Sequence, residues 1–242
     1  MELTVLGCSG SYNAPPAGAC SGYLLREGVT TIWMDCGHGS FTNLQRQLDP
    51  GDLTAIVITH EHPDHCVDVY GLHVLLRYAL ERSGVPIYAP AGADERLGTL
   101  ANWGDTFAWH AIDDGAHTTI GPIDLAFSRT DHPPPTFAVQ ATGADGRRLV
   151  YTSDTGPGWS VDAFAPGAEL VLSEASYEEA DLRSPIHLSG KMAGAAAREA
   201  RAQRLVLTHL WPRVDPAVVG AEGSEAFGEA VTMAAVDLTL PV

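Results

Sequence analysis

The sequence predicts an α/β fold in one domain. Runs of β-type residues alternate with segments whose apolar residues recur at helical spacing, which is typical of sheets covered by helices. The chain has 242 residues, of which 45% are hydrophobic, and a domain of that length buries a sizeable core. Because no linker or low-complexity tract divides the chain, we expect residues 1–242 to form a single domain.

The first third of the chain begins with three β-type runs and then alternates between strand and helix. Clusters of Gly, Ser and Pro separate the three runs and are typical of turns. A long stretch of helical spacing stops at Gly84, a residue type that commonly ends helices. We expect strands at residues 2–7, 22–27, 30–37 and 53–60, and helices at residues 41–48 and 67–84.

The other two thirds return to strands and then alternate again. The sequence GADG, residues 143–146, is a hairpin signal between two β-type runs. Further along, an Ala-rich helical segment lies between two short apolar runs. We expect strands at residues 85–90, 119–132, 136–143, 147–154, 170–176, 204–210 and 236–240, and helices near residues 94–103, 189–203 and 216–230.

The composition restricts the partners of the protein. The net charge is −16 and Lys191 is the one lysine among 14 basic residues, which argues against a broad surface for nucleic-acid phosphates. The opening MELTVLG has no basic leader region, and no apolar run reaches the ~18 residues that span a bilayer. We expect a cytoplasmic protein with no membrane partner. Its four cysteines form no CxxC pair, which indicates neither a zinc ribbon nor a redox motif, and we expect reduced thiols.

Ligand-type side chains gather where the predicted strands end. The stretch THEHPDHC places His60 and His62 two residues apart at a strand end, so both imidazoles point the same way. Asp64 and His65 follow, where Pro63 indicates the start of a helix. Three other apolar runs, LAFSRTDH, RLVYTSD and RLVLTH, also end in Thr or Ser followed by Asp or His.

These residue types suit a catalytic metal site. Zinc-like ions take three or four nitrogen, oxygen or sulfur ligands, and imidazole with carboxylate leaves a position open for water. The strand-end residues His132, Asp154 and His209 are the candidates that complete the set, and Asp154 could bridge two ions. Taken singly, Asp64 could be a helix N-cap, and His132 or His209 an ordinary polar group at a strand end.

The stretch THEHPDH resembles the HxHxDH signature of the metallo-β-lactamase fold superfamily, and the order of the remote residues fits the whole chain. The resemblance implies a four-layer αββα sandwich with two divalent metal ions, zinc foremost and Mn or Fe as alternatives. It also implies that Asp35 and Gly37, which resemble the D-x-G element, shape a turn behind the metals. By this resemblance one metal is held by His60, His62 and His132, the other by Asp64, His65 and His209, and Asp154 bridges them.

Further motifs resemble the tRNase Z and phosphodiesterase branch of this superfamily. YTSDTG, at residues 151–156, resembles its Y-S-G-D-T element, and SEASY followed by HLSG resembles H-E-A-T and G-H-S-T. By analogy Glu174 orients His187, and His187 faces the scissile phosphate. Ser173 and Ile186 depart from the family pattern, and the alternative role for His187 is to flank a helix capped by Ser189.

The size of the substrate follows from charge and spacing. One hairpin fills the interval from His132 to Asp154, so the arm by which bacterial tRNase Z grips tRNA is absent. We expect a dinuclear hydrolase that cleaves small phosphodiesters such as cyclic nucleotides by a metal-bridging hydroxide, which Asp64 would orient. A tRNA 3′-processing endoribonuclease and a lactonase or other ester hydrolase are the alternatives, and a homodimer is possible. Trp159, Trp211 and Tyr177 could line a base-binding pocket, although packing is their commoner role.

Overall fold

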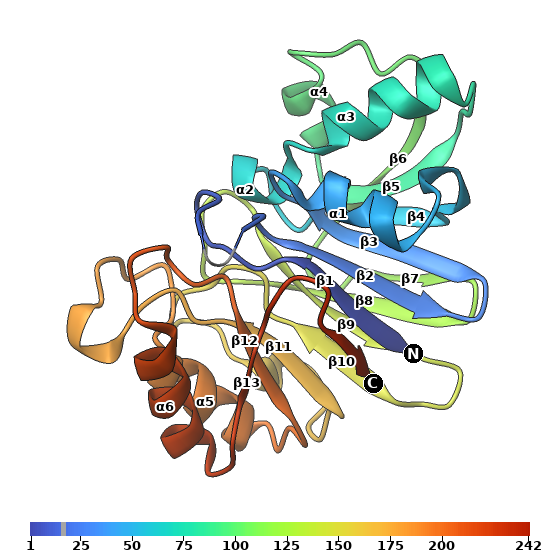
Figure 1. Cartoon of the computed structure of the whole chain (residues 1–242). Coiled ribbons are helices and arrows are strands. Elements are labelled where there is room, and N and C mark those ends of the chain that lie inside the picture. Colours follow the sequence, from blue (N-terminus) through green and yellow to red (C-terminus); the bar gives the residue numbers. More distant parts are fainter. Residues whose placement is uncertain (16–17) are drawn as a thin grey trace.

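The computed structural model describes residues 1–15 and 18–242 as two mixed β-sheets packed face to face, with helices on both outer faces (Figure 1). The layers follow the order helix, sheet, sheet, helix, as the sequence resemblance implies. No helix in the described part of the chain has the length and apolar character that crossing a bilayer requires.

The first sheet has the strand order β14-β1-β2-β3-β4-β5-β6. Its strands β14, β1, β2 and β3 pair antiparallel, whereas β3, β4, β5 and β6 pair parallel. The strands are β1 (Glu2–Gly7), β2 (Gly22–Glu27), β3 (Thr30–Cys36), β4 (Ala55–Val57), β5 (Val85–Pro90), β6 (Phe107–Ile112) and β14 (Thr239–Pro241).

The second sheet has the order β13-β12-β11-β10-β9-β8-β7. Here β7, β8, β9 and β10 pair antiparallel, and β10, β11, β12 and β13 pair parallel. The strands are β7 (His117–Ile120), β8 (Ile123–Arg129), β9 (Phe137–Thr142), β10 (Arg148–Tyr151), β11 (Leu170–Glu174), β12 (Leu205–Thr208) and β13 (Thr232–Met233).

Helices cover each sheet on its outer face (Figure 1). The first sheet carries α1 (Ser40–Gln47), α2 (Pro63–Cys66), α3 (Val69–Val74) with the π-helical turn Leu75–Ala79, and α4 (Ala93–Leu97). The second carries α5 (Gly190–Glu199) and α6 (Pro216–Phe227). A Cβ on Gly194 would lie 2.4 Å from the carbonyl oxygen of Gly223, so glycine lets these two helices touch. Short 3₁₀ turns lie at Pro50–Asp52, Val161–Ala163 and Glu179–Asp181.

The alternation of side chains along the strands creates the core layers. In β3, Met34 points between the sheets and the neighbouring Trp33 points to the helices, as a period of two requires. Tyr23 and Tyr151 meet across the two sheets, with ring centroids 4.9 Å apart. On the other outer face, Val171 and the buried alanines Ala193 and Ala197 of α5 belong to a third cluster.

Several elements differ from their predicted limits. The strand expected at residues 53–60 keeps ladder pairing only over Ala55–Val57, because the Thr59 amide turns to donate to the Asp35 carboxylate. The helix expected at 67–84 ends at the π-helical turn Leu75–Ala79, and Glu81 has a positive φ of 50°. The run 119–132 begins within a hairpin that turns at Gly121. Strand β6, at the edge of its sheet and partly exposed, was not predicted.

The strand directions gather the ligand-type residues at one rim. Parallel pairing brings the carboxyl ends of β3 and β4 together, and β8, β10, β11 and β12 run in one direction in the other sheet. Sites in layered α/β folds form outside such ends, where loops converge without disturbing the core.

Candidate metal centre

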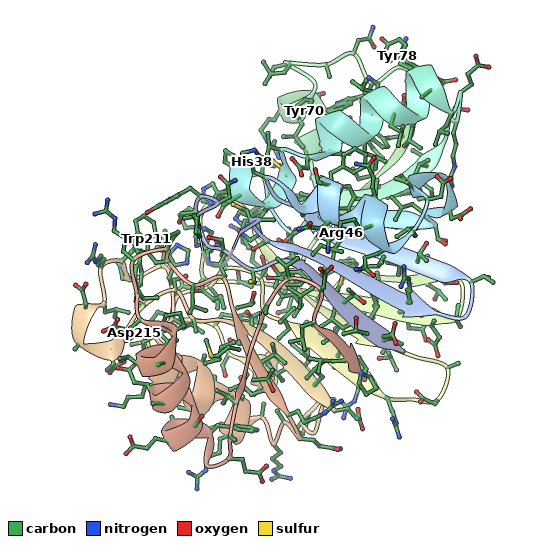
Figure 2. The ribbon with its side chains drawn as sticks, viewed as in Figure 1. His38, Arg46, Tyr70, Tyr78, Trp211 and Asp215 are labelled. Atoms are coloured by element: carbon green, nitrogen blue, oxygen red, sulfur yellow. The ribbon has the colours of Figure 1, made fainter. Side chains whose placement is uncertain are left out.

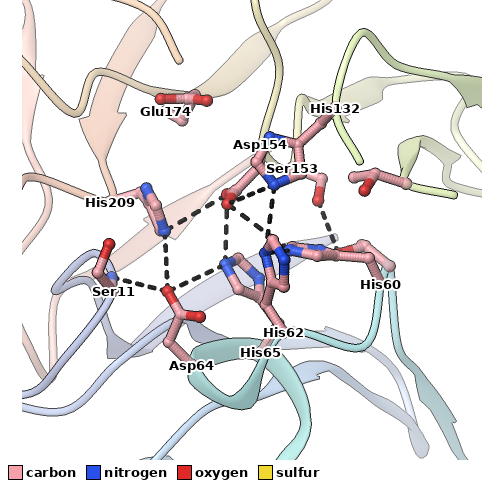
Figure 3. A network of polar contacts seen from close by, with 12 residues as sticks. Ser11, His60, His62, Asp64, His65, His132, Ser153, Asp154, Glu174 and His209 are labelled. Atoms are coloured by element: carbon pink, nitrogen blue, oxygen red, sulfur yellow. Dashed lines mark hydrogen bonds and ion pairs between the residues drawn. The ribbon is translucent and has the colours of Figure 1, made fainter. Parts of the chain in front are cut away.

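All seven residues that the sequence singled out as candidate metal ligands meet at this rim (Figure 3). His60 and His62 follow β4, Asp64 and His65 lie on α2, and the other three come from the opposite sheet. Their ligand atoms fall into two groups, each within 4.8 Å: His60, His62, His132 and Asp154 in one, and Asp64, His65 and His209 in the other.

Asp154 lies between the two groups. Its Oδ1 is 3.2 Å from Nε2 of His65 and 3.4 Å from Nε2 of His209. Its Oδ2 faces the other group, 3.6 Å from Nε2 of His60 and 3.7 Å from Nε2 of His132. Two ligands about 2.1 Å from one tetrahedral ion lie roughly 3.4 Å apart, so these spacings suit a cation between each pair. One carboxylate oxygen per group is the arrangement of a bridging ligand.

Two buried polar atoms indicate that the centre is built for cations. Nε2 of His65 and Oδ1 of Asp154 have no hydrogen-bond partner among the described residues, although both are enclosed. A buried polar atom without a partner is costly, and such atoms call for a bound ion or water. Because both atoms point at the same place, a cation between them would satisfy them together.

The electrostatics of the site favour the metal-binding forms of its side chains. Burial lowers the pKa of His60, His62 and His132, so their imidazoles stay neutral. Although burial alone would raise the pKa values of Asp64 and Asp154, the neighbouring histidines lower them. Neutral imidazole and ionised carboxylate are the forms that bind metals.

His65 differs because carboxylates surround it. Burial alone would lower its pKa, but Asp154, Asp35 and Asp64 raise that pKa well above the ordinary value. In the metal-free protein a proton on this ring therefore supplies positive charge where a cation would sit. Metal binding here is expected to release that proton.

The second nitrogen of most of these histidines is fixed by a neighbour. A partner of this kind sets which nitrogen faces the metal and how the ring is oriented. The His62 ring has the opposite orientation, because its Nδ1 faces the other candidate ligands and lies 3.2 Å from Nε2 of both His60 and His132. The Nδ1 contacts of the others are Asp35 Oδ2 for His65 (2.8 Å), Ser176 Oγ for His209 (2.9 Å), the Ile186 carbonyl for His132 (3.0 Å) and Thr59 Oγ1 for His60 (3.2 Å).

Asp35 lies behind the candidate ligands and is hydrogen-bonded to the segments that carry them. Its buried carboxylate accepts hydrogen bonds from the Thr59 amide (2.8 Å), the Thr59 hydroxyl (2.9 Å) and the Tyr151 hydroxyl (2.8 Å), besides its contact with His65. Asp35 has a positive φ of 55°, and a Cβ on Gly37 would lie 2.0 Å from the Asp64 carbonyl oxygen. The D-x-G turn therefore lets α2 approach and places a carboxylate behind His65.

Replacing Asp35 by Asn is expected to destabilise the metal-free protein by roughly 2–4 kcal/mol. Asn tolerates the left-handed backbone, so the loss comes from an amide that cannot accept every one of these hydrogen bonds. Denaturant unfolding followed by circular dichroism measures the change. Asp237→Asn, which removes an exposed pair with Arg46, is the control and should change stability by at most about 1 kcal/mol. Equal effects of the two variants would contradict the role given to Asp35.

His187 and Glu174 lie together above the candidate ligands. Glu174 Oε1 is 3.0 Å from Nδ1 of His187, and the His187 ring is 5.0 Å from that of His132 and 5.5 Å from that of His209. Burial alone would lower the pKa of His187, but the Glu174 carboxylate raises it to about 9. Ser189 also caps α5, accepting from the Met192 amide, so His187 both flanks a helix cap and faces the centre.

Two residues at the centre were not predicted. The Ser11 amide donates to Oδ2 of Asp64 at 2.7 Å, from the glycine-rich loop that follows β1 (Figure 3). Ser176 contacts both Glu174 and His209. Ser176 lies within the SEASY stretch that resembles H-E-A-T, two residues after Glu174, but the resemblance assigned it no role.

The three candidate aromatic residues have different surroundings. Trp159 packs on Phe164, and its indole donates to Ser128, so it has a packing role. The Tyr177 ring lies 5.9 Å from that of His187. Trp211, labelled in Figure 2, lines an apolar cavity of about 390 Å³ together with Leu210, which directly follows His209.

The fold and the histidine and aspartate clusters define a metallo-hydrolase with the β-lactamase fold. The chain belongs to the beta-lactamase superfamily domain family, whose model matches residues 30–210. It is 34% identical to the uncharacterized protein Rv1339 of Mycobacterium tuberculosis, over 100% of this chain and 92% of that protein. It is 32% identical to the probable metallo-hydrolase YhfI of Bacillus subtilis, over 87% of each chain.

Two solved structures show the same architecture. The metallo-beta-lactamase fold protein YhfI superposes with a TM-score of 0.89 at 27% identity, over 99% of this chain and 98% of that one. The short form of human tRNase Z superposes with a TM-score of 0.80 at 25% identity, over 100% of this chain and 99% of that one. The likeness covers the whole chain, so it includes the strands that carry the candidate ligands.

Proposed function

We propose that the protein is a phosphodiesterase that hydrolyses small phosphodiesters such as cyclic nucleotides with the help of two divalent metal ions. The observation that carries this proposal is the His187–Glu174 pair, which places a proton-bearing imidazole over a centre suited to two cations. A poor alkoxide leaving group of a phosphodiester departs more easily when such an acid gives it a proton.

The seven side chains divide between the two ions as their spacing suggests. One ion would be held by His60, His62 and His132, the other by Asp64, His65 and His209, and Asp154 would give one oxygen to each. Zinc suits this mixture of imidazole and carboxylate, and Mn or Fe would also be accepted. When bound, the ions would neutralise the phosphate and make a water nucleophilic near neutral pH.

The chain itself supplies orientation and proton transfer. The Ser11 amide donates to Oδ2 of Asp64 at 2.7 Å, so this carboxylate is held where it can orient the attacking water. His187 donates its Nδ1 proton to Glu174, which leaves Nε2 to carry the proton for the departing oxygen. Glu174 also stabilises the charged imidazole through the short distance between the two groups.

A small substrate fits the charge around the site. The interval from His132 to Asp154 is filled by β9 and β10, without an inserted arm. The basic residues on either side of His187 in sequence, Arg183 and Lys191, both pair with acids. Because the net charge of the chain is −16 and these basic residues are paired, the protein has little electrostatic attraction for a long polyanion. A tRNA-processing nuclease remains the second candidate because of the likeness to tRNase Z.

The expected result of a substrate comparison is metal-dependent hydrolysis of bis-p-nitrophenyl phosphate and of cyclic AMP by the purified protein. The assay includes a lactone and a precursor tRNA, with Zn or Mn added after treatment with a chelator, and elemental analysis counts the metals per chain. Cleavage of the lactone alone would point to an ester hydrolase. A clear electrophoretic shift with tRNA at moderate salt, together with its cleavage, would overturn the small-substrate assignment.

A further inference from the structure

Glu174 is fully buried, and both of its carboxylate oxygens are in use. Oε1 accepts from the Thr155 amide at 2.7 Å and lies 3.0 Å from Nδ1 of His187. Oε2 accepts from the Ser176 hydroxyl at 2.8 Å and from the Leu188 amide at 3.2 Å. One carboxylate therefore joins the β10 loop, the His187 segment and Ser176.

Ser176 continues this network to the candidate metal ligand His209. Its Oγ is 2.9 Å from Nδ1 of His209, while Nε2 of the same ring faces Asp64 and Asp154. A ring that offers the Nε2 lone pair to a cation carries its proton on Nδ1, so that nitrogen donates to Ser176. The single hydroxyl proton of Ser176 then goes to Oε2 of Glu174, which as an ionised acceptor forms the stronger bond.

We propose that Ser176 is a positioning residue for His209, and that through Ser176 the one carboxylate of Glu174 holds both His209 and His187 in place. The inference rests on the proposed function in that it takes His209 as a metal ligand. His65 is held by a carboxylate directly and His132 by a backbone carbonyl, whereas His209 is held by a hydroxyl that itself needs Glu174.

The loop after β1 also packs closely against His209. A Cβ on Gly10 would lie 2.6 Å from the His209 carbonyl oxygen and 3.0 Å from its Nδ1, so the loop after β1 presses on this residue. Ser176 is thus the side chain that sets the tautomer of a ring whose backbone is already confined. Loss of its hydroxyl removes the acceptor of the Nδ1 proton of His209 and one of the two donors to Oε2 of Glu174.

The test measures metal affinity in the absence of any substrate. Metal-free protein competes with a chromophoric chelator for zinc, and the two dissociation constants are compared among variants. Ser176→Ala is expected to weaken one of the two sites by about 10–100-fold, the usual effect of removing a residue that orients a metal ligand. Ser176→Thr, which keeps the hydroxyl, should restore most of that affinity.

Ser173→Ala is the matched control. Ser173 is a buried serine on β11, and its hydroxyl donates to the Glu174 backbone carbonyl at 2.9 Å without contacting His209. Its zinc affinities should equal those of the wild type. Wild-type affinity of Ser176→Ala at both sites, or an equal loss in Ser173→Ala, would overturn the proposal. Should Ser176→Ala fail to fold, Ser176→Cys keeps the shape with a weak donor and should show an intermediate loss.

The shared carboxylate is tested by Glu174→Gln. This variant should weaken zinc binding at the same site as Ser176→Ala, and the double variant should be little weaker than either single one, because both changes break one chain of contacts. Glu174→Gln with wild-type zinc affinity would remove Glu174 from the arrangement. Because these readouts involve no phosphodiester, their outcome is separate from that of the substrate assays.

Discussion

Replacing Asp154 by Asn is expected to lower metal-dependent phosphodiester hydrolysis by at least about 10³-fold, which corresponds to several kcal/mol of lost charge stabilisation by the metals. Asp154 is the residue whose two oxygens face both groups of candidate ligands. An amide has the same shape but no charge and one oxygen fewer, so it cannot serve both ions. The measurements are initial rates with bis-p-nitrophenyl phosphate at saturating zinc and the zinc content per chain.

The control for this variant is Asp145→Asn, an identical chemical change at an exposed position of the hairpin that leads into Asp154. It should leave both the rate and the zinc content unchanged. A protein with Asn at position 154 that retains two zinc ions and wild-type rates would show that the two groups of ligands do not act as one centre.

The candidate ligands could be predicted because their signal is local. His60, His62, Asp64 and His65 lie in one short stretch, and the remote members each end an apolar run in Thr or Ser before the ligand. Strand direction then brings those ends to one rim without further information. The α/β class follows from the same regularity, since alternating strands and helices of this length form sheets covered by helices. The four-layer sandwich was implied by the resemblance of the motifs to the superfamily.

What was missed depends on contacts between distant segments. Ser11 reaches Asp64 across 53 residues, and Ser176 reaches His209 across 33, so neither contact is visible in a short window. Both contacts also need unusual backbone. Ser11, Asp35 and His209 have positive φ values of 60°, 55° and 57°, conformations that such side chains rarely adopt and that packing must impose. Propensity alone cannot predict them.

The predicted limits of several strands and helices were wrong for a related reason. In β4 the pattern of apolar residues continues to Ile58, but the ladder stops early because Thr59 is used to hold Asp35. The strand β6 escaped prediction because an edge strand with partly exposed residues has a weak alternation. In both cases the tertiary environment, at the site or at the sheet edge, overrides the local sequence pattern.

Replacing His187 by Asn is expected to lower kcat by about 10²–10⁴-fold for a substrate with a poor alkoxide leaving group. With p-nitrophenolate as the leaving group, the expected loss of kcat is less than about tenfold, because this anion departs without needing a proton from the acid. The contrast between the two substrates is the measurement. A residue that only shaped the site would reduce both rates alike.

The pH profile gives a second readout of the same pair. His187 acts in its protonated form, so activity is lost as pH rises through its pKa, which Glu174 raises to about 9 in the metal-free protein. Bound cations repel the proton and move this alkaline limb to lower pH. Glu174→Gln removes the carboxylate that favours the charged ring, so its limb should lie lower still, whereas the exposed Glu225→Gln should leave it in place.

Zinc content separates the acid from another role that the geometry permits. His187, Asp154 and His209 also have ligand atoms within 4.8 Å of one another, so His187 could itself bind a metal. His187→Asn should keep two zinc ions per chain with unchanged affinity if the ring acts as the acid. Loss of one ion, with equal rate losses for both leaving groups, would make His187 a ligand and transfer the task of protonating the leaving group to water.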